Sequence, residues 1–139
     1  MHLLDTDTLT HLHRGHPRVV ERLRAVGDSD VGTTIITKIE LLRGRFEFML
    51  KAATGNDLLR AQRLLARTEE LLSQIMVVPF DERAAEQFDK LIKAKGLKKI
   101  GRADLLIGSI ALVHRATLVT RNVRHFERIP DLIVTNWVD

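Results

Sequence analysis

Short apolar runs alternate along the chain with longer segments in which apolar residues recur at helical spacing. The short runs are rich in leucine or β-branched residues and end at polar or turn-forming residues, which is typical of buried strands. The expected strands cover residues 2–4, 31–36, 75–78, 117–120 and 132–135. Strands that alternate with helices in this way predict a mainly parallel sheet.

The longer segments predict helices, because the residue types at their ends suit helix caps. Asp5 precedes a short helix that runs to about His13, and Gly27 closes a second helix that begins at Arg18. Further helices are expected over 37–50, 57–74, 81–96 and 102–115. The last of these is apolar nearly all round and should be buried. The pattern as a whole predicts an α/β fold, with a single domain over 1–139 and a sheet of about five strands flanked by helices on both faces.

Composition narrows the function classes. With 139 residues, 45% of them hydrophobic, the chain can fill one core, and its net charge of +4 is compatible with a nucleic-acid partner without requiring one. The absence of cysteine excludes disulfides, zinc thiolate sites and thiol catalysis. There is no P-loop, dinucleotide-binding or nucleophile-elbow motif. No apolar stretch is long enough to span a bilayer, and we expect a cytoplasmic protein without a membrane partner.

Four polar residues stand where predicted strands end or the following helices begin. Asp5 follows the first strand, and Glu40 lies in the first turn of the helix after the second strand. Asp104 lies in the first turn of the buried helix, and Asn122 follows the strand that ends at Thr120. Ligands of α/β sheets bind outside the carboxyl ends of the strands, where the strand order reverses. We therefore expect these four side chains at one edge of the sheet.

Each of these residues also has a local explanation. Thr37 and Glu40 fit a capping box. Asp104 suits the positive end of its helix, whereas Asp5 and Asn122 suit turns. Their coincidence favours a shared site, because carboxylates brought together in a partly buried cleft repel one another unless a cation offsets their charge. Oxygen ligands in a chain without cysteine favour Mg²⁺ or Mn²⁺ over zinc.

Four short segments follow one another along the chain: LLDTD at 3–7, TKIELLRG at 37–44, GRADLLI at 101–107 and LVTRN at 118–122. In sequence, order and spacing they resemble the PIN domain, and most of all the VapC-type toxins of bacterial toxin–antitoxin pairs. The ending, from Phe126 to Trp137, is similar to that family's last strand. The resemblance covers essentially the whole chain.

This resemblance implies an endoribonuclease that uses Mg²⁺ or Mn²⁺ and is held inactive by a cognate antitoxin. By position, the acidic metal ligands are Asp5, Glu40 and Asp104, and Asn122 falls where members carry a fourth polar residue. Asn122 carries no charge, which disfavours a second tightly held metal, and the extra carboxylate of Asp7 would replace part of the missing charge. The remaining members of the predicted site are the supporting hydroxyls of Thr6 and Thr120.

The hypothesis for the reaction is hydrolysis by an activated water. A metal ion held by Asp5 and Asp104 lowers the pKa of a bound water and polarises the phosphodiester, while Glu40 orients the attacking water. The family analogy implies products with 5′-phosphate and 3′-hydroxyl ends. A 2′,3′-cyclic phosphate product, or full activity in EDTA, would exclude this scheme.

Arginines near the four motifs are the candidate RNA contacts, since phosphate contacts position a strand. They are Arg43, Arg102, Arg121 and Arg124. Aromatic residues make up only 4% of the chain, so extensive base stacking is not expected. Apolar residues at 46–50 exceed what one helix face needs and favour either a groove for an antitoxin segment or a homodimer contact.

The histidines of the chain admit other interpretations. His11, His13 and His16 invite a zinc site, but on one helix only His13 and His16 would share a face, and surface histidines are favoured. Metal-free cleavage by a histidine pair is a minor option. Two alternatives of a different kind stay open: a PIN-type nuclease in RNA processing or acting on structured DNA without a toxin role, and a non-catalytic module that binds a partner or nucleic acid.

Overall fold

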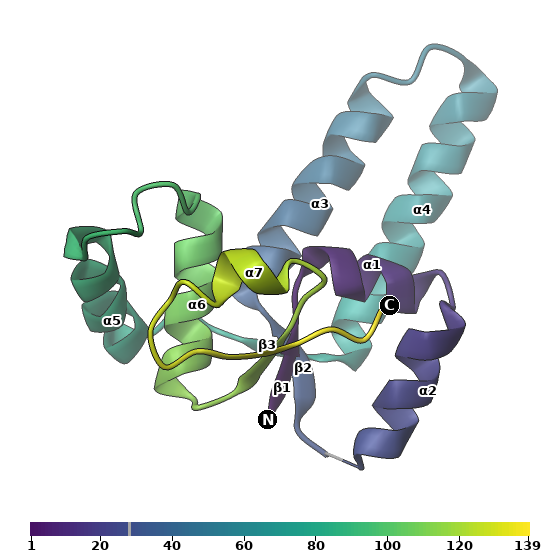
Figure 1. Cartoon of the computed structure of the whole chain (residues 1–139). Coiled ribbons are helices and arrows are strands. Elements are labelled where there is room, and N and C mark those ends of the chain that lie inside the picture. The colour runs from purple at the N-terminus through teal and green to yellow at the C-terminus, as the bar shows by residue number, and fades with distance from the viewer. Residues whose placement is uncertain (28) are drawn as a thin grey trace.

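A computed structural model describes residues 1–27 and 29–139. Within those residues, five strands form one sheet in the order β3-β2-β1-β4-β5, and every neighbouring pair is parallel (Figure 1). The strands are β1 (His2–Leu4), β2 (Val31–Thr34), β3 (Met76–Val78), β4 (Thr117–Val119) and β5 (Ile133–Thr135). The chain builds outward from β1 to β3 on one side and then returns to add β4 and β5 on the other, so the strand order reverses at β1.

Helices connect successive strands. They are α1 (Thr6–His13), α2 (Pro17–Val26), α3 (Ile35–Leu50), α4 (Gly55–Gln74), α5 (Glu82–Lys93), α6 (Arg102–Val113) and α7 (Val123–Phe126). Figure 1 shows α3 and α4 as a long antiparallel hairpin that projects from the sheet, while α5 and α6 pack together on the other side of the molecule.

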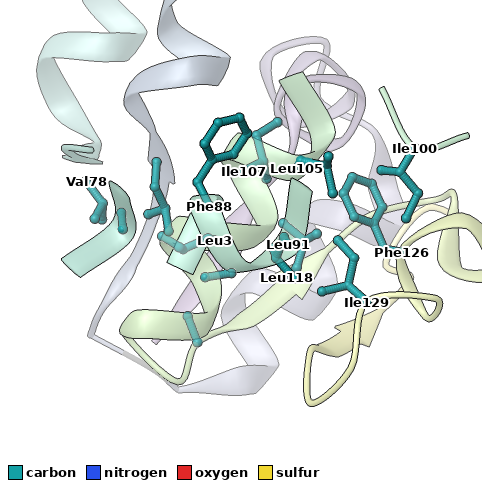
Figure 2. Packing of buried hydrophobic residues seen from close by; sticks show 14 of the residues in the cluster. Leu3, Val78, Phe88, Leu91, Ile100, Leu105, Ile107, Leu118, Phe126 and Ile129 are labelled. Atoms are coloured by element: carbon teal, nitrogen blue, oxygen red, sulfur yellow. The ribbon is translucent and has the colours of Figure 1, made fainter. Parts of the chain in front are cut away.

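Two hydrophobic clusters lie on opposite faces of the sheet because successive side chains of a strand point in opposite directions. Leu3 and Leu118 belong to the cluster under α5 and α6. Figure 2 shows this cluster, which also contains Phe88 of α5. Their neighbours Leu4 and Val119 belong to the second cluster, with residues of α1 to α4. Helices therefore cover both faces of a parallel sheet, which confirms the predicted α/β fold class.

The buried helix is also confirmed, since most residues of α6 from Leu105 to Ala111 are buried. The starts of two other helices differ from the prediction. Thr34 caps α3 by accepting a hydrogen bond from Thr37 N at 3.2 Å, so the helix begins at Ile35 and the β-branched run 31–36 is strand only to Thr34. Thr54 caps α4 in the same way, so residues 55 and 56 form its first turn rather than a loop.

Among the described residues, no helix combines the length and the apolar character needed to cross a membrane.

Candidate active site

A pocket of about 450 Å³ opens at the carboxyl edge of the sheet, beside the point where the strand order reverses. It is lined by residues that follow β1 and β4 and by residues of α3 and α6. They are Asp5, Thr6, Asp7, Glu40, Asp104, Ile107, Arg121, Asn122 and Phe126. The four positions predicted to meet, Asp5, Glu40, Asp104 and Asn122, thus line one pocket.

Asp5 lies at the base of this site, directly after β1, and caps α1. Its Oδ1 accepts a hydrogen bond from Thr8 N at 2.9 Å, and the buried hydroxyl of Thr120 also hydrogen-bonds the carboxylate. Burial raises the pKa of Asp5 above 3.8, and the neighbouring charge of Asp7 adds to the shift, while the hydrogen bonds oppose it. Among the described residues, no cation pairs with this carboxylate, so its charge is offset by neutral donors alone.

Glu40 is more exposed than Asp5 and is held by a side chain from another helix. Thr6 Oγ1 donates a hydrogen bond to Glu40 Oε1 at 2.7 Å, and Thr6 Oγ1 also lies 3.2 Å from Thr37 Oγ1. The capping-box interpretation of Thr37 and Glu40 is wrong, because Thr34 is the cap and α3 starts at Ile35. Glu40 consequently lies in the second turn of α3, and its carboxylate is available to the pocket.

Asp104 lies in the first turn of α6, as predicted, and has a partner that the sequence analysis did not identify. The Nε2–H of His125 donates to Asp104 Oδ2 at 2.8 Å, across from α7. The short helix α7 was itself not predicted. His125 lies three positions after Asn122, one helical turn away, and this spacing is the one signal in the sequence that links His125 to the pocket.

Asn122 and Asp7 occupy the rim. Asn122 is exposed, stands at the start of α7 and makes no capping hydrogen bond with its side chain, while its backbone N–H donates to Thr120 Oγ1 at 3.1 Å. Asp7 is exposed as well, with its carboxylate 3.7 Å from His11 Nδ1. Both side chains therefore remain accessible to a ligand in the pocket.

Of the four arginines predicted to contact RNA, one lines the pocket and three do not. Arg121 lines the pocket and donates from Nε to Asp139 Oδ2 at 3.2 Å. Elsewhere in the described chain, Arg43 pairs with Glu47 one turn along α3. Arg102 lies over the ring of Phe88 at 5.3 Å, and Arg124 is exposed without lining the pocket.

The whole pocket lies within a segment that matches a known family model: residues 2–132 match the PIN domain. The chain belongs to the PIN domain family. Among curated proteins, it is 28% identical to ribonuclease VapC1 of Haemophilus influenzae strain R2866 over 142 residues, which cover 99% of this chain and 98% of that protein. It is 39% identical to ribonuclease VapC2 of Rickettsia felis over 75 residues, covering 52% of this chain and 55% of that protein.

The fold of this PIN domain also matches solved structures. A structure of DNA-bound VapBC from Salmonella typhimurium superposes with a TM-score of 0.81 at 28% identity, covering 98% of this chain and 97% of that chain. The match extends over the sheet and all the elements that position the pocket. The family identified from the four sequence segments is thereby confirmed.

The donor set of this PIN domain suits a sparsely bound hard cation. The pocket offers carboxylate and amide oxygens and no sulfur. Within the described residues, no three His, Asp or Glu side chains stand close enough together to hold one metal ion directly. A closed four-ligand zinc site does not fit this spacing, whereas Mg²⁺, which usually keeps several waters and takes one or two carboxylates, does.

The three N-terminal histidines are arranged differently from the helical prediction. The helix ends at His13, and His16 caps α2, so these two do not share a helix face. Instead, the rings of His11 and His16 meet edge to face, with centroids 5.2 Å apart.

Proposed function

We propose that this PIN domain is an endoribonuclease, the toxin of a toxin–antitoxin pair, which hydrolyses RNA phosphodiester bonds. The observation that carries the proposal is the convergence of four carboxylates on one pocket at the reversal point of the sheet, with Asp5 largely buried beneath it. The relatives named ribonuclease VapC and the structural match to VapBC support the same activity and the same kind of partner.

The cofactor of the proposed reaction is Mg²⁺ or Mn²⁺, which Asp5 and Asp104 would hold directly and Glu40 through an intervening water. When bound, such an ion lowers the pKa of a water ligand and stabilises charge on the phosphoryl oxygens. Its charge also offsets the cost of burying the Asp5 carboxylate. The polar groups of Asn122 and Asp7 at the rim complete the site, and Thr120 supports Asp5 from below.

Three other side chains orient the water, the metal ligand and the substrate in the proposed reaction. Glu40, fixed by the Thr6 hydroxyl, accepts a hydrogen bond from the attacking water and sets its direction. His125 fixes one oxygen of Asp104 and leaves the other toward the pocket. Arg121 at the rim offers a guanidinium to the phosphate of the substrate once it leaves Asp139.

The proposed protein partner is an antitoxin, and a second copy of this chain is the proposed dimer partner. Both the antitoxin and the second copy would bind apolar side chains, most of them exposed, at the free end of the α3–α4 hairpin, where they line a hollow of about 350 Å³. These side chains are Phe46, Met49, Leu50 and Leu58. Light scattering of the free protein tests the dimer, and a strictly monomeric protein would exclude it. Co-purification with the product of a neighbouring gene tests the antitoxin.

A cleavage assay with single-stranded RNA and Mn²⁺ tests the enzyme. Wild type should cut the RNA, leave 5′-phosphate ends and lose activity in EDTA. Asp5→Asn and Asp104→Asn should each lose at least about a hundredfold in rate, because each removes a charged ligand. Asp89→Asn on the exposed face of α5 is the matched control and should retain full activity. Cleavage that survives in EDTA, or that both site variants retain, would overturn the proposal.

Induced expression tests the toxin role separately. Growth should stop when the intact protein is made alone, continue when the Asp104→Asn variant is made, and recover when the neighbouring gene is expressed together with the intact protein. RNA cleavage in vitro without growth arrest in cells would support a nuclease and exclude the toxin.

A further inference from the structure

A second group of charged side chains lies outside the pocket, where the end of α1 meets the α3–α4 hairpin. It consists of His13, Arg14, Arg45 and Arg67, hereafter the basic cluster. His13 is the last residue of α1 and Arg14 is its C-terminal cap. Because α1 packs against α3, these two residues face the hairpin. Arg45 of α3 reaches across to α4 and donates from Nε to Thr68 Oγ1 at 3.1 Å, next to Arg67.

The basic cluster has no acidic counterpart. Within the described chain, none of its three arginines forms an ion pair, whereas Arg43 and Arg121 both do. Partial burial lowers the pKa of His13, and the charges of Arg45, Arg67 and Arg14 lower it further. Arg45 is also half-buried, and its pKa is lowered by burial and by Arg14. The dipole of α1 accounts for a cation at Arg14 but not for those on α3 and α4.

Crowded cations of this kind cost stability in the free protein and bind an anion that arrives. Two helices lead from the pocket to the basic cluster. One is α1, which begins beside Asp5 and spans about 12 Å over its eight residues. The other is α3, on which Glu40 and Arg45 lie about 7.5 Å apart along the axis but about 140° apart around it, so α1 gives the direct path. A polyanion with regularly spaced charges can therefore occupy the pocket and the basic cluster together.

We propose that the basic cluster binds a backbone phosphate of single-stranded RNA, a few nucleotides from the phosphate that is cleaved in the pocket. This inference rests on the proposed function for the identity of the strand. It assigns the positioning of the RNA to residues on α1, α3 and α4. Arg43 and Arg102, two of the arginines flanking the motifs, are already engaged by Glu47 and Phe88. Phosphate contacts of this kind add affinity and register without reading bases.

The test removes two exposed members of the cluster, in the variant Arg14→Gln/Arg67→Gln. The matched control, Arg24→Gln/Lys93→Gln, loses the same charge from exposed positions on α2 and α5. Binding of a labelled RNA decanucleotide is measured by fluorescence anisotropy in EDTA over a range of salt concentrations. The cluster variant should bind about tenfold more weakly, and its salt slope should fall by about 0.7, the value for one lost phosphate contact to a single strand. The control should match wild type.

Cleavage kinetics give a second readout. The KM for the decanucleotide should rise in the cluster variant with kcat unchanged, while a dinucleotide, which is too short to reach the cluster, should be cut equally by all three proteins. Equal decanucleotide affinity for the cluster variant and the control would overturn the inference. So would unchanged RNA binding together with weakened binding of an antitoxin, which would assign the cluster to a protein partner.

The two proposals fail in different ways. Normal cleavage of RNA by a cluster variant with unchanged affinity refutes the phosphate site alone. Wild type that binds the decanucleotide through the cluster but never cleaves it with Mn²⁺ refutes the nuclease and leaves the phosphate site supported.

Discussion

The imidazole of His125 and the carboxylate of Asp104 are joined by a 2.8 Å hydrogen bond between Nε2 and Oδ2. Both side chains are partly buried at the wall of the pocket, and the two residues, on α6 and α7, are 21 positions apart in sequence. The bond fixes the rotation of the Asp104 carboxylate, so that its second oxygen has a defined direction. A hydrogen-bond donor behind an acidic ligand is a common way to orient the ligand and tune its affinity for a metal ion.

This bond predicts that His125→Leu weakens Mn²⁺ binding and slows cleavage by about ten- to a hundredfold, because Asp104 loses its orienting donor. His125→Gln is the matched variant, since its side-chain amide can donate from a similar position, and it should stay within a few-fold of wild type. Calorimetric titration with Mn²⁺ measures the affinity independently of the reaction. Equal affinities for the two variants would show that the hydrogen bond does not position Asp104.

The carboxylates of the site could be predicted from sequence because their positions depend on backbone topology alone. Asp5 follows a strand and Asp104 starts a helix, and a parallel sheet brings such positions to one edge. The bonds of Thr6 to Glu40 and of His125 to Asp104 could not be predicted, because they depend on side-chain conformations across elements far apart in sequence.

The contacts of the arginines could not be fully predicted from sequence either. Sequence proximity to a motif places the Cα atom near the site but leaves the direction of a long side chain open, and competing partners decide it. For Arg43 that partner, Glu47, stands four residues on along the same helix, a spacing visible in the sequence. For Arg102 the partner is Phe88 on the neighbouring helix α5, which only the fold reveals. Helix starts are limited similarly, since Thr34 and Thr37 are both suitable cap residues and only the structure shows that Thr34 is the cap.

The buried charge of Asp5 predicts that Asp5→Asn stabilises the metal-free protein at neutral pH. Burial raises the folded-state pKa above 3.8, the ordinary value. Well below pH 3.8 the carboxyl is protonated whether the chain is folded or not, and its burial then costs no stability. As the pH rises through the window between the two pKa values, the unfolded chain releases its proton first, and stability falls. Above the raised pKa the full cost persists.

Urea unfolding in EDTA at pH 3 and pH 7.5 measures this effect. The free energy of unfolding of Asp5→Asn should exceed that of wild type by almost nothing at the lower pH and by about 1 kcal/mol at pH 7.5. Gains of this size are common when a destabilising active-site residue is replaced. Asp81→Asn is the control, because Asp81 caps α5 through the same 2.9 Å bond to a backbone N–H but is exposed. It should show no gain that grows with pH. A constant difference at both pH values for Asp5→Asn would contradict the prediction.

The hydroxyl of Thr6 holds Glu40, which predicts a selective kinetic defect when it is removed. Thr6→Val keeps the branched shape but loses the 2.7 Å hydrogen bond to Oε1, so Glu40 becomes mobile. We expect kcat to fall about tenfold with little change in KM, since the contact fixes the residue that orients the attacking water and so affects the chemical step. Thr6→Ser restores the donor and should recover most of the rate. Equal losses in Val and Ser variants would assign the effect to helix α1 instead.

The close approach of β2 and β3 at Gly32 predicts that the pocket depends on a position far from it. A Cβ atom at Gly32 would stand 2.4 Å from the carbonyl oxygen of Met76, which belongs to the backbone of β3 and has no side-chain freedom to move aside. Gly32→Ala should therefore destabilise the fold by about 2 kcal/mol or more, as overpacking does. It should also lower activity, because β2 leads directly into Thr34, the cap of the helix that carries Glu40.

The control is Gly44→Ala, on the exposed side of α3, where no atom lies within 4 Å of the added Cβ. It should instead stabilise the protein by about 0.5–1 kcal/mol. Thermal unfolding of the two variants checks the opposite signs, and a stable, fully active Gly32→Ala protein would show that β2 and β3 can separate without disturbing the site.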